Sequence, residues 1–311
     1  MEYHLLHRAG KAGAWRPIVG IVALVAWMFF FAALVVLVPF IAVAALQGKD
    51  LGATISSLTS LDDPTPGALA YLNIALASLI PATFLVSWVL HGLKPGWLTS
   101  VMPRMRWRFF VACLGLAVVA LIATLIVSAV LPQGPAGEGT EITGELNAWT
   151  STVRDFVLVV AFLTPFQAAG EEYLFRGYLT QAFGGLFGSR VVAVVVPAVL
   201  FALAHGLGQS VPVFFDRLAF GLVAGVLVIL TGGLEAGIAM HVLNNWLAFG
   251  LALAFGDLAS TLNPTGGTWW SIPSTLTQSL VFLALAWWVS RRMGLRSTVD
   301  PLVLEPSAGR V

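Results

Sequence analysis

The stretch PIVGIVALVAWMFFFAALVVLVPFIAVAAL, residues 17–46, is thirty residues long and has no charged side chain. A helix needs about 20 apolar residues to cross the hydrocarbon core of a bilayer, so this run can span it with a tilt. The apolar part of a secretory signal peptide is only about 7–15 residues long. We therefore expect residues 17–46 to form a retained membrane helix, although Ala42-Val43-Ala44 resembles a cleavage site.

Seven further apolar runs follow, divided by breaks that are polar or rich in glycine and proline. They cover residues 68–91, 108–131, 154–175, 190–206, 211–230, 234–255 and 273–290. Charged residues make up only 10% of the chain, against about 25% in soluble domains. Lipid must therefore cover much of the surface. The predicted fold is all-α: a polytopic membrane protein with about eight transmembrane helices around a polar intramembrane cavity.

The membrane runs also predict how the chain is organised, because no internal repeat and no soluble domain interrupts them. We expect a cytoplasmic N-terminal segment over 1–16 and three membrane helices with their connections over 17–150. Residues 151–255 would form the membrane core that carries the polar motifs. Residues 256–311 would form a final membrane helix and a cytoplasmic tail. Within the core, the glycine-rich stretch 177–189 is expected to be an irregular connection.

The distribution of charge predicts the orientation in the membrane, since lysine and arginine concentrate in cytoplasmic loops. Basic residues cluster before the first run, between the second and third runs, and after the last run. The connections 47–67 and 132–153 are mostly acidic. With eight spans, both termini would lie in the cytoplasm, and the short loops favour a prokaryotic inner (plasma) membrane. The net charge of +1 does not indicate a nucleic-acid partner.

Three ionisable residues end the fourth run, in the segment Glu171-Glu172-Tyr173-Leu174-Phe175-Arg176. A charge near the bilayer centre costs at least about 2.5–3.5 kcal/mol, so such residues are functional candidates. On a helix, Glu172 and Arg176 lie four residues apart and can form an ion pair. Glu171 is turned from Glu172 by about 100° and can face elsewhere, free to do chemistry. An ordinary cap of charges at a helix end is the alternative interpretation.

Two histidines, His205 and His241, lie inside apolar runs. His241 is followed four residues later by Asn245, so the two share a helix face. Together they can donate two hydrogen bonds to one point, as a developing oxyanion requires. A hydrogen-bonded packing role is the alternative for each histidine. The remaining histidines fall at polar ends and are expected to be solvated: His4, His7 and His91.

The depths of the two candidate histidines differ if each helix starts at the membrane surface. At about 1.5 Å per residue, His205 lies about 22 Å from the start of its helix at Arg190. His241 lies only about 10 Å from the start of its helix at Leu234. A single site therefore requires tilted helices, or a deeper start of the fifth run with residues 177–189 partly embedded.

Three motifs occur in order: Glu171-Glu172-x-x-x-Arg176, Phe201-x-x-x-His205 and His241-x-x-x-Asn245. Their order and membrane positions resemble the CAAX-protease and bacteriocin-processing family of intramembrane proteases, whose eukaryotic members are the Rce1-type prenyl-protein endopeptidases. The resemblance covers about residues 155–250. It implies an intramembrane endopeptidase that acts on a peptide or a membrane protein within the lipid bilayer.

The resemblance also implies a role for each motif residue. Glu171 would activate the attacking water, with His205 assisting. His241 and Asn245 would stabilise the tetrahedral oxyanion. Glu172 and Arg176 would form a supporting ion pair, with Arg176 able to meet a substrate carboxylate.

The sequence favours a site without a metal. The zinc-protease motif His-Glu-x-x-His is absent from the sequence, and no two candidate ligands have its i, i+4 spacing. A bound zinc would have to take Glu171, His205 and His241 as ligands, because a catalytic zinc usually has three protein ligands and one water.

Two other classes of function remain open from the residues alone. Buried carboxylates and histidines also suit a proton- or ion-coupled transporter, although the chain lacks the paired broken segments that transporter halves carry. A non-catalytic membrane scaffold or immunity protein is the third hypothesis. Convergence of Glu171, His205, His241 and Asn245 around one water would favour the protease.

Overall fold

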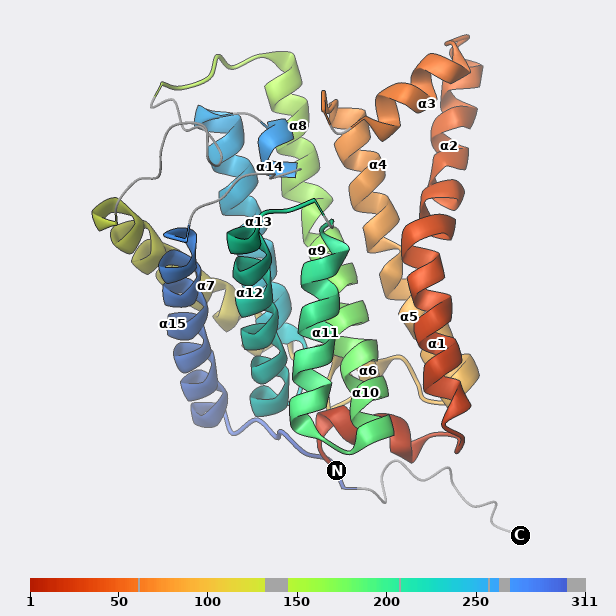
Figure 1. The fold of residues 1–311 in the computed structure, drawn as a ribbon, viewed down its shortest axis with the longest axis vertical. Helices are drawn as coiled ribbons and strands as arrows, with labels where there is room; N and C mark the ends of the chain where they lie inside the picture. The colour runs from red at the N-terminus through yellow and green to blue at the C-terminus, as the bar shows by residue number, and fades with distance from the viewer. Residues whose placement is uncertain (61, 132–144, 207, 257, 263–268, 301–311) are drawn as a thin grey trace.

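The computed structural model describes the whole chain except residues 61, 132–144, 207, 257, 263–268 and 301–311. Across the described residues the secondary structure is helical, with two isolated β-bridges and no extended strand. Seven helical stretches are long and apolar enough to cross a membrane. The protein is therefore an all-α polytopic membrane protein, and the predicted fold class is confirmed (Figure 1).

Three of the seven membrane stretches consist of more than one helical element, because π-helical segments or single turns interrupt the α-helices. In chain order the elements are η1 (Tyr3–Ala9), α1 (Trp15–Ala26), η2 (Trp27–Phe31), α2 (Ala32–Leu46), α3 (Leu51–Thr59), α4 (Pro66–Ala77), α5 (Leu79–Val86), η3 (Ser87–His91), α6 (Gly96–Thr99), α7 (Trp107–Val130), α8 (Ser151–Phe162), α9 (Thr164–Glu172), η4 (Tyr173–Leu179), α10 (Thr180–Phe187), α11 (Arg190–Ala204), α12 (Val211–Thr231), α13 (Glu235–Phe255), α14 (Leu258–Leu262) and α15 (Ser271–Arg292).

Seven of the eight predicted runs become helices of membrane length. The run 190–206 becomes α11, whose 15 residues fall short of the about 20 that a span needs. α11 nevertheless reverses the chain between α10 and α12 (Figure 1). The two ends of the described chain consequently meet, and the Met1 ammonium donates a hydrogen bond to the Val299 carbonyl at 2.5 Å.

The glycine-rich stretch 177–189 was expected to be irregular, and this prediction is wrong. The helix of the fourth run continues through η4 and α10 to Phe187. Gly188 then ends it in the left-handed conformation that glycine adopts without steric cost, at φ 69° and ψ 12°. The glycines serve close packing as well, since a Cβ on Gly184 would lie 2.1 Å from the His4 carbonyl oxygen.

The N-terminal segment packs against this helix, which buries three histidines that were expected to be solvated. His4, His7 and His91 are only 2%, 5% and 1% exposed. The His7 ring stacks on the His91 ring with centroids 3.8 Å apart. Arg8 Nε donates a hydrogen bond to the Gly185 carbonyl at 2.7 Å. The expectation failed because η1 covers the end of α10, a contact between segments far apart in sequence.

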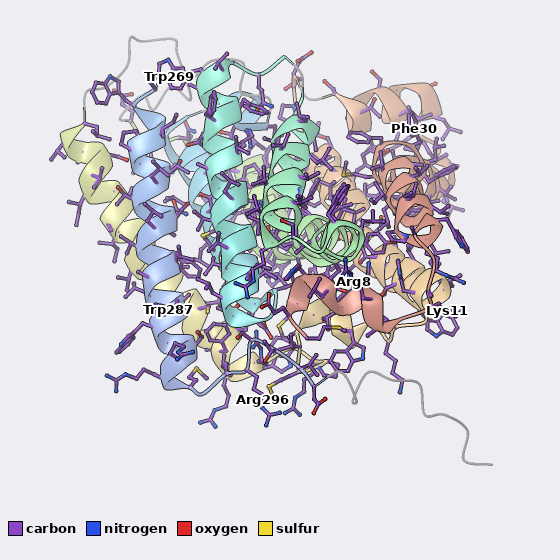
Figure 2. All side chains as sticks on the ribbon, turned by 60° about the horizontal axis from the view of Figure 1, so that its bottom comes forward. Arg8, Lys11, Phe30, Trp269, Trp287 and Arg296 are labelled. Atoms are coloured by element: carbon purple, nitrogen blue, oxygen red, sulfur yellow. The ribbon has the colours of Figure 1, made fainter. Side chains whose placement is uncertain are left out.

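The end of the molecule that carries both described ends of the chain is also basic. Figure 2 shows Arg8, Lys11 and Arg296 at this end and Trp269 at the opposite end. The basic clusters at the two chain ends, which the sequence assigns to one side of the membrane, therefore lie together in space.

Helix α13 starts inside the protein, beneath the segment that connects η3 to α7. Glu235, its first residue, is fully buried. It accepts hydrogen bonds from Arg106 Nε at 2.8 Å and from Arg106 Nη2 at 2.6 Å. The Leu234 amide donates to the Thr99 carbonyl at 2.9 Å. His241 therefore lies deeper than a count from the membrane surface indicates, which removes the mismatch in depth with His205.

Candidate active site

The four residues predicted to be catalytic line one cavity of about 420 Å³. Its wall is formed by α4, α9, α12, α13, α14, the end of α11 and the start of α15. Segments far apart in the sequence therefore meet at one place. The predicted residues that line the cavity are Glu171, His205, His241 and Asn245.

Glu171 is held from one side by a chain of amide hydrogen bonds. Gln167 lies one turn earlier on the same helix face, and its Nε2 donates to Glu171 Oε1 at 2.8 Å. Asn245 Nδ2 in turn donates to Gln167 Oε1 at 3.0 Å. Glu171 Oε2 has no hydrogen-bond partner within the described residues. One carboxylate oxygen is thus fixed in place while the other remains available for chemistry.

His241 lies between the two adjacent glutamates. Its Nδ1 is 3.0 Å from Glu172 Oε1, and its Nε2 is 3.5 Å from Glu171 Oε2. Glu172 is ionised in its pair with Arg176, and an ionised carboxylate only accepts hydrogen bonds, so Nδ1 must donate. In the neutral ring, Nε2 then presents a lone pair toward Glu171. These two acceptors, His241 Nε2 and Glu171 Oε2, can share a proton or a hydrogen of a water molecule.

Glu172 and Arg176 form a buried ion pair outside the wall of the cavity. Arg176 Nη1 lies 3.0 Å from Glu172 Oε1, four residues apart on the helix as their spacing predicts. The side chains are 1% and 0% exposed. The Arg176 guanidinium lies over the Phe201 ring at 4.1 Å, which stabilises a cation in a dry site. Because neither residue lines the cavity, this structure gives Arg176 no access to a substrate.

His205 caps the end of α11 and faces the cavity from a different side. Its Nδ1 is 2.8 Å from the Phe201 carbonyl, four residues earlier in the same motif. A carbonyl oxygen accepts hydrogen bonds, so Nδ1 donates and Nε2 of the neutral ring carries the free lone pair. Such a nitrogen can accept a hydrogen bond from a water molecule in the cavity.

The donor set does not fit a metal ion. Among the described residues, no three His, Cys, Asp or Glu side chains come together in a group that could hold one. His241 Nδ1 is committed to Glu172 at 3.0 Å and His205 Nδ1 to its own helix at 2.8 Å. Each ring therefore has one free nitrogen, and together with Glu171 these do not converge as a three-ligand site.

Gln167, Asp216 and Arg217 are among the polar residues of the cavity that were missed at the level of sequence. Gln167 precedes Glu171 by four residues, so the i, i+4 spacing that predicts the pair of Glu172 and Arg176 also predicts a contact between Gln167 and Glu171. Asp216 and Arg217 are charged residues inside the apolar run 211–230, and ionisable residues inside membrane runs are functional candidates. The positions of all three at the cavity became visible only in the folded chain.

Residues 153–247 match the family described as type II CAAX prenyl endopeptidase Rce1-like. The chain is 31% identical over 140 residues to the membrane-embedded CAAX protease MroQ of Staphylococcus aureus (strain USA300), covering 43% of this chain and 54% of that protein. It is 29% identical over 140 residues to the uncharacterized protein YyaK of Bacillus subtilis (strain 168), covering 42% of this chain and 47% of that protein. The chain thus spans about half the length of the curated relatives it matches.

No solved structure matches the chain significantly. The match to the family lies over the segment that supplies α8 to α13 and hence most of the cavity wall. It contains all three motifs and each of the seven residues that they name. This match and the similarity to a CAAX protease support the assignment of the chain to the CAAX-protease and bacteriocin-processing family.

Proposed function

We propose that the protein is an intramembrane endopeptidase that hydrolyses a peptide bond with a water molecule activated by Glu171 and His205. The observation that carries this proposal is the single cavity into which the three motifs bring Glu171, His205, His241 and Asn245. Glu171 there keeps one carboxylate oxygen without a hydrogen-bond partner in the described part of the chain. A general base requires an oxygen that is not already committed to another hydrogen-bond donor.

The reaction begins with a water molecule between Glu171 Oε2 and His205 Nε2. Glu171 takes a proton from this water as its oxygen attacks the carbonyl carbon of the scissile peptide bond. The tetrahedral intermediate carries the negative charge on the former carbonyl oxygen. Glu171 then gives the proton to the leaving amide nitrogen, the carbon–nitrogen bond breaks, and a carboxylic acid and an amine are released.

The oxyanion needs donors that are free at that moment. In the resting protein, Asn245 Nδ2 is bound to Gln167 at 3.0 Å, and His241 Nδ1 to Glu172 at 3.0 Å. Asn245 would therefore exchange Gln167 for the oxyanion. His241 would donate from Nε2 once that nitrogen holds a proton, and the ion-paired Glu172 stabilises this charged ring. The site would hold no tightly bound metal.

The proposed cellular setting is a bacterial inner membrane with both termini in the cytoplasm, and the substrate would be a peptide or a membrane protein. The basic end of the molecule supports this orientation, because positive charge marks cytoplasmic loops (Figure 2).

The experiment compares purified wild-type protein with Glu171→Gln and with Asp155→Asn. Asp155 is a surface carboxyl on α8, 46% exposed and paired with Arg154, so it serves as the matched control. Each protein is incubated in detergent with a peptide library of random sequence, and new peptide ends are counted by mass spectrometry. Loss of at least about 100-fold in Glu171→Gln alone is expected. Equal cleavage by wild type and Glu171→Gln would refute the proposal.

A further inference from the structure

An arginine lies in the wall of the cavity, and the proposed chemistry does not use it. Arg217 lines the cavity from α12, together with its neighbour Asp216. Its Nε is buried and has no hydrogen-bond partner among the residues that the structure describes. In the described part of the chain, no carboxylate forms an ion pair with Arg217.

Every other charge near the site has a partner. Asp216 accepts a hydrogen bond from the Thr275 hydroxyl of α15. Glu171 is held by Gln167 at 2.8 Å. Arg176 is buried in an ion pair with Glu172, with Nη1 and Oε1 3.0 Å apart. Arg217 thus differs from Arg176 in both respects that matter for binding, since it lines the cavity and has no ion-pair partner among the described residues.

An unpaired guanidinium in a partly dry cavity is unfavourable for folding, because it has lost water without gaining an ion partner. A bound anion would supply what is missing. The planar fork of arginine matches a carboxylate, which it can bind through two parallel hydrogen bonds.

The position of Arg217 places this anion near the scissile bond. Phe220 lies three residues after Arg217 on α12, so the two share a helix face about one turn apart. The Phe220 ring packs against the His241 ring with centroids 5.2 Å apart. One turn is about 5 Å, and an extended peptide advances about 3.3–3.6 Å per residue. The anion would thus lie on the order of one to three residues from the bond that is cut.

We propose that Arg217 determines specificity by binding a carboxylate of the peptide substrate close to the scissile bond. This inference rests on the proposed endopeptidase function. The carboxylate can belong to the C-terminus of the substrate or to an aspartate or glutamate side chain, and both present the same group to the guanidinium. Arg217 takes the role that the sequence offered to Arg176, because Arg217 lines the cavity and Arg176 does not.

The test uses purified full-length protein and random-sequence peptide libraries in matched forms. One pair has either a free C-terminal carboxylate or a C-terminal carboxamide. A second pair has amidated ends and contains either Asp and Glu or Asn and Gln at the varied positions. The proteins are wild type, Arg217→Gln, Arg217→Lys and the control Arg154→Gln. Arg154 is 58% exposed on α8 and does not line the cavity.

Wild type is expected to cleave the carboxylate form of at least one pair roughly 10- to 100-fold more efficiently than the neutral form. Arg217→Gln should abolish this preference by raising KM for the carboxylate form, with kcat and the rate on the neutral form close to wild type. Arg217→Lys should restore part of the preference, and Arg154→Gln should retain all of it. The pair that shows the effect identifies the source of the carboxylate.

Three outcomes would overturn the inference. If Arg217→Gln keeps the preference for the carboxylate form, another group binds the carboxylate. If the wild type shows no preference between the two forms, no group of the protein recognises the carboxylate. An equal loss on charged and neutral libraries would assign Arg217 to folding instead of specificity. In each case cleavage by wild type leaves the endopeptidase function intact, whereas absence of any cleavage that depends on Glu171 would refute both.

Discussion

Glu171 and His205 lie at equal distances from the turn that joins their helices, seventeen residues before and seventeen residues after Gly188. The antiparallel pairing of these helices brings residues with the same separation from the turn together. Phe175 and Phe201, each thirteen residues from Gly188, confirm the register, since their rings are 5.3 Å apart. The two predicted water-activating residues therefore reach the same depth because α10 and α11 form a hairpin.

Inserting one alanine between Ala202 and Leu203 should disturb this register without moving Phe201. His205 would be turned by about 100° around the helix and carried away from the cavity. We expect proteolysis of the random peptide library to fall by at least about 100-fold, because proton transfer depends on hydrogen-bond reach. The same insertion after Gly208 lies beyond the helix and should have a much smaller effect. Comparable activity in the two insertion variants would contradict the assigned role of His205.

Replacing Glu172 with Gln should act on stability, unlike the replacement of Glu171. It would leave the Arg176 guanidinium, 1% exposed, as an uncompensated buried charge. Loss of one partner of a buried ion pair costs roughly 3–5 kcal/mol. Thermal unfolding in detergent should show this loss, whereas Asp155→Asn breaks an exposed pair and should cost about 0–1 kcal/mol. An unfolding temperature of Glu172→Gln equal to that of the control would show that the pair contributes nothing.

Acid should loosen the docking of the N-terminal segment. Burial lowers the pKa of His7 well below its usual value of 6.5, so the folded segment holds a neutral ring against His91. The unfolded chain takes up a proton below about pH 6.5, and this uptake favours the undocked state. Stability from this contact is therefore present above that pH and lost as the pH falls.

The measurement for this prediction is the unfolding temperature between pH 8 and pH 5, on the order of one pKa unit to either side of 6.5. His7→Phe keeps an aromatic ring for stacking on His91 but cannot be protonated. Its unfolding temperature should fall less toward acid than that of the wild type. Parallel curves for the two proteins would rule out His7 as the titrating group.

The orientation in the membrane can be tested with reporter fusions. A reporter after Arg296 should report the cytoplasm, as the basic charge at that end predicts. A reporter after Gly48, at the far end of the first membrane helix Trp15–Leu46, should report the opposite side. Both reporters on one side would exclude the predicted topology.

Activity should not require a bound metal, because the described histidines and carboxylates do not form a three-ligand group. Purified active protein is expected to contain far less than one equivalent of zinc and to keep its activity in a chelator. Stoichiometric zinc, with activity lost to the chelator and restored by zinc, would make His241 a ligand and overturn the water-activation scheme.

The membrane helices and the three motifs could be predicted from the sequence by itself, because they depend on local properties. The length of an apolar run decides whether a helix can span lipid, as for residues 17–46. The spacing of Glu172 and Arg176 puts them on one helix face, and they form the predicted pair at 3.0 Å. Neither prediction requires knowledge of any other segment.

Only the tertiary structure decided how the polar groups are shared among the helices. His241 and Asn245 share a face as predicted, yet His241 contacts both glutamates and Asn245 binds Gln167. These partners are separated by about seventy residues, and local spacing says nothing about contacts between distant helices. The same reason explains why the burial of His7 could not be foreseen. The tertiary structure also decided which arginine lines the cavity: Arg176 is buried outside the cavity wall, whereas the packing of α12 leaves Arg217 open to the cavity.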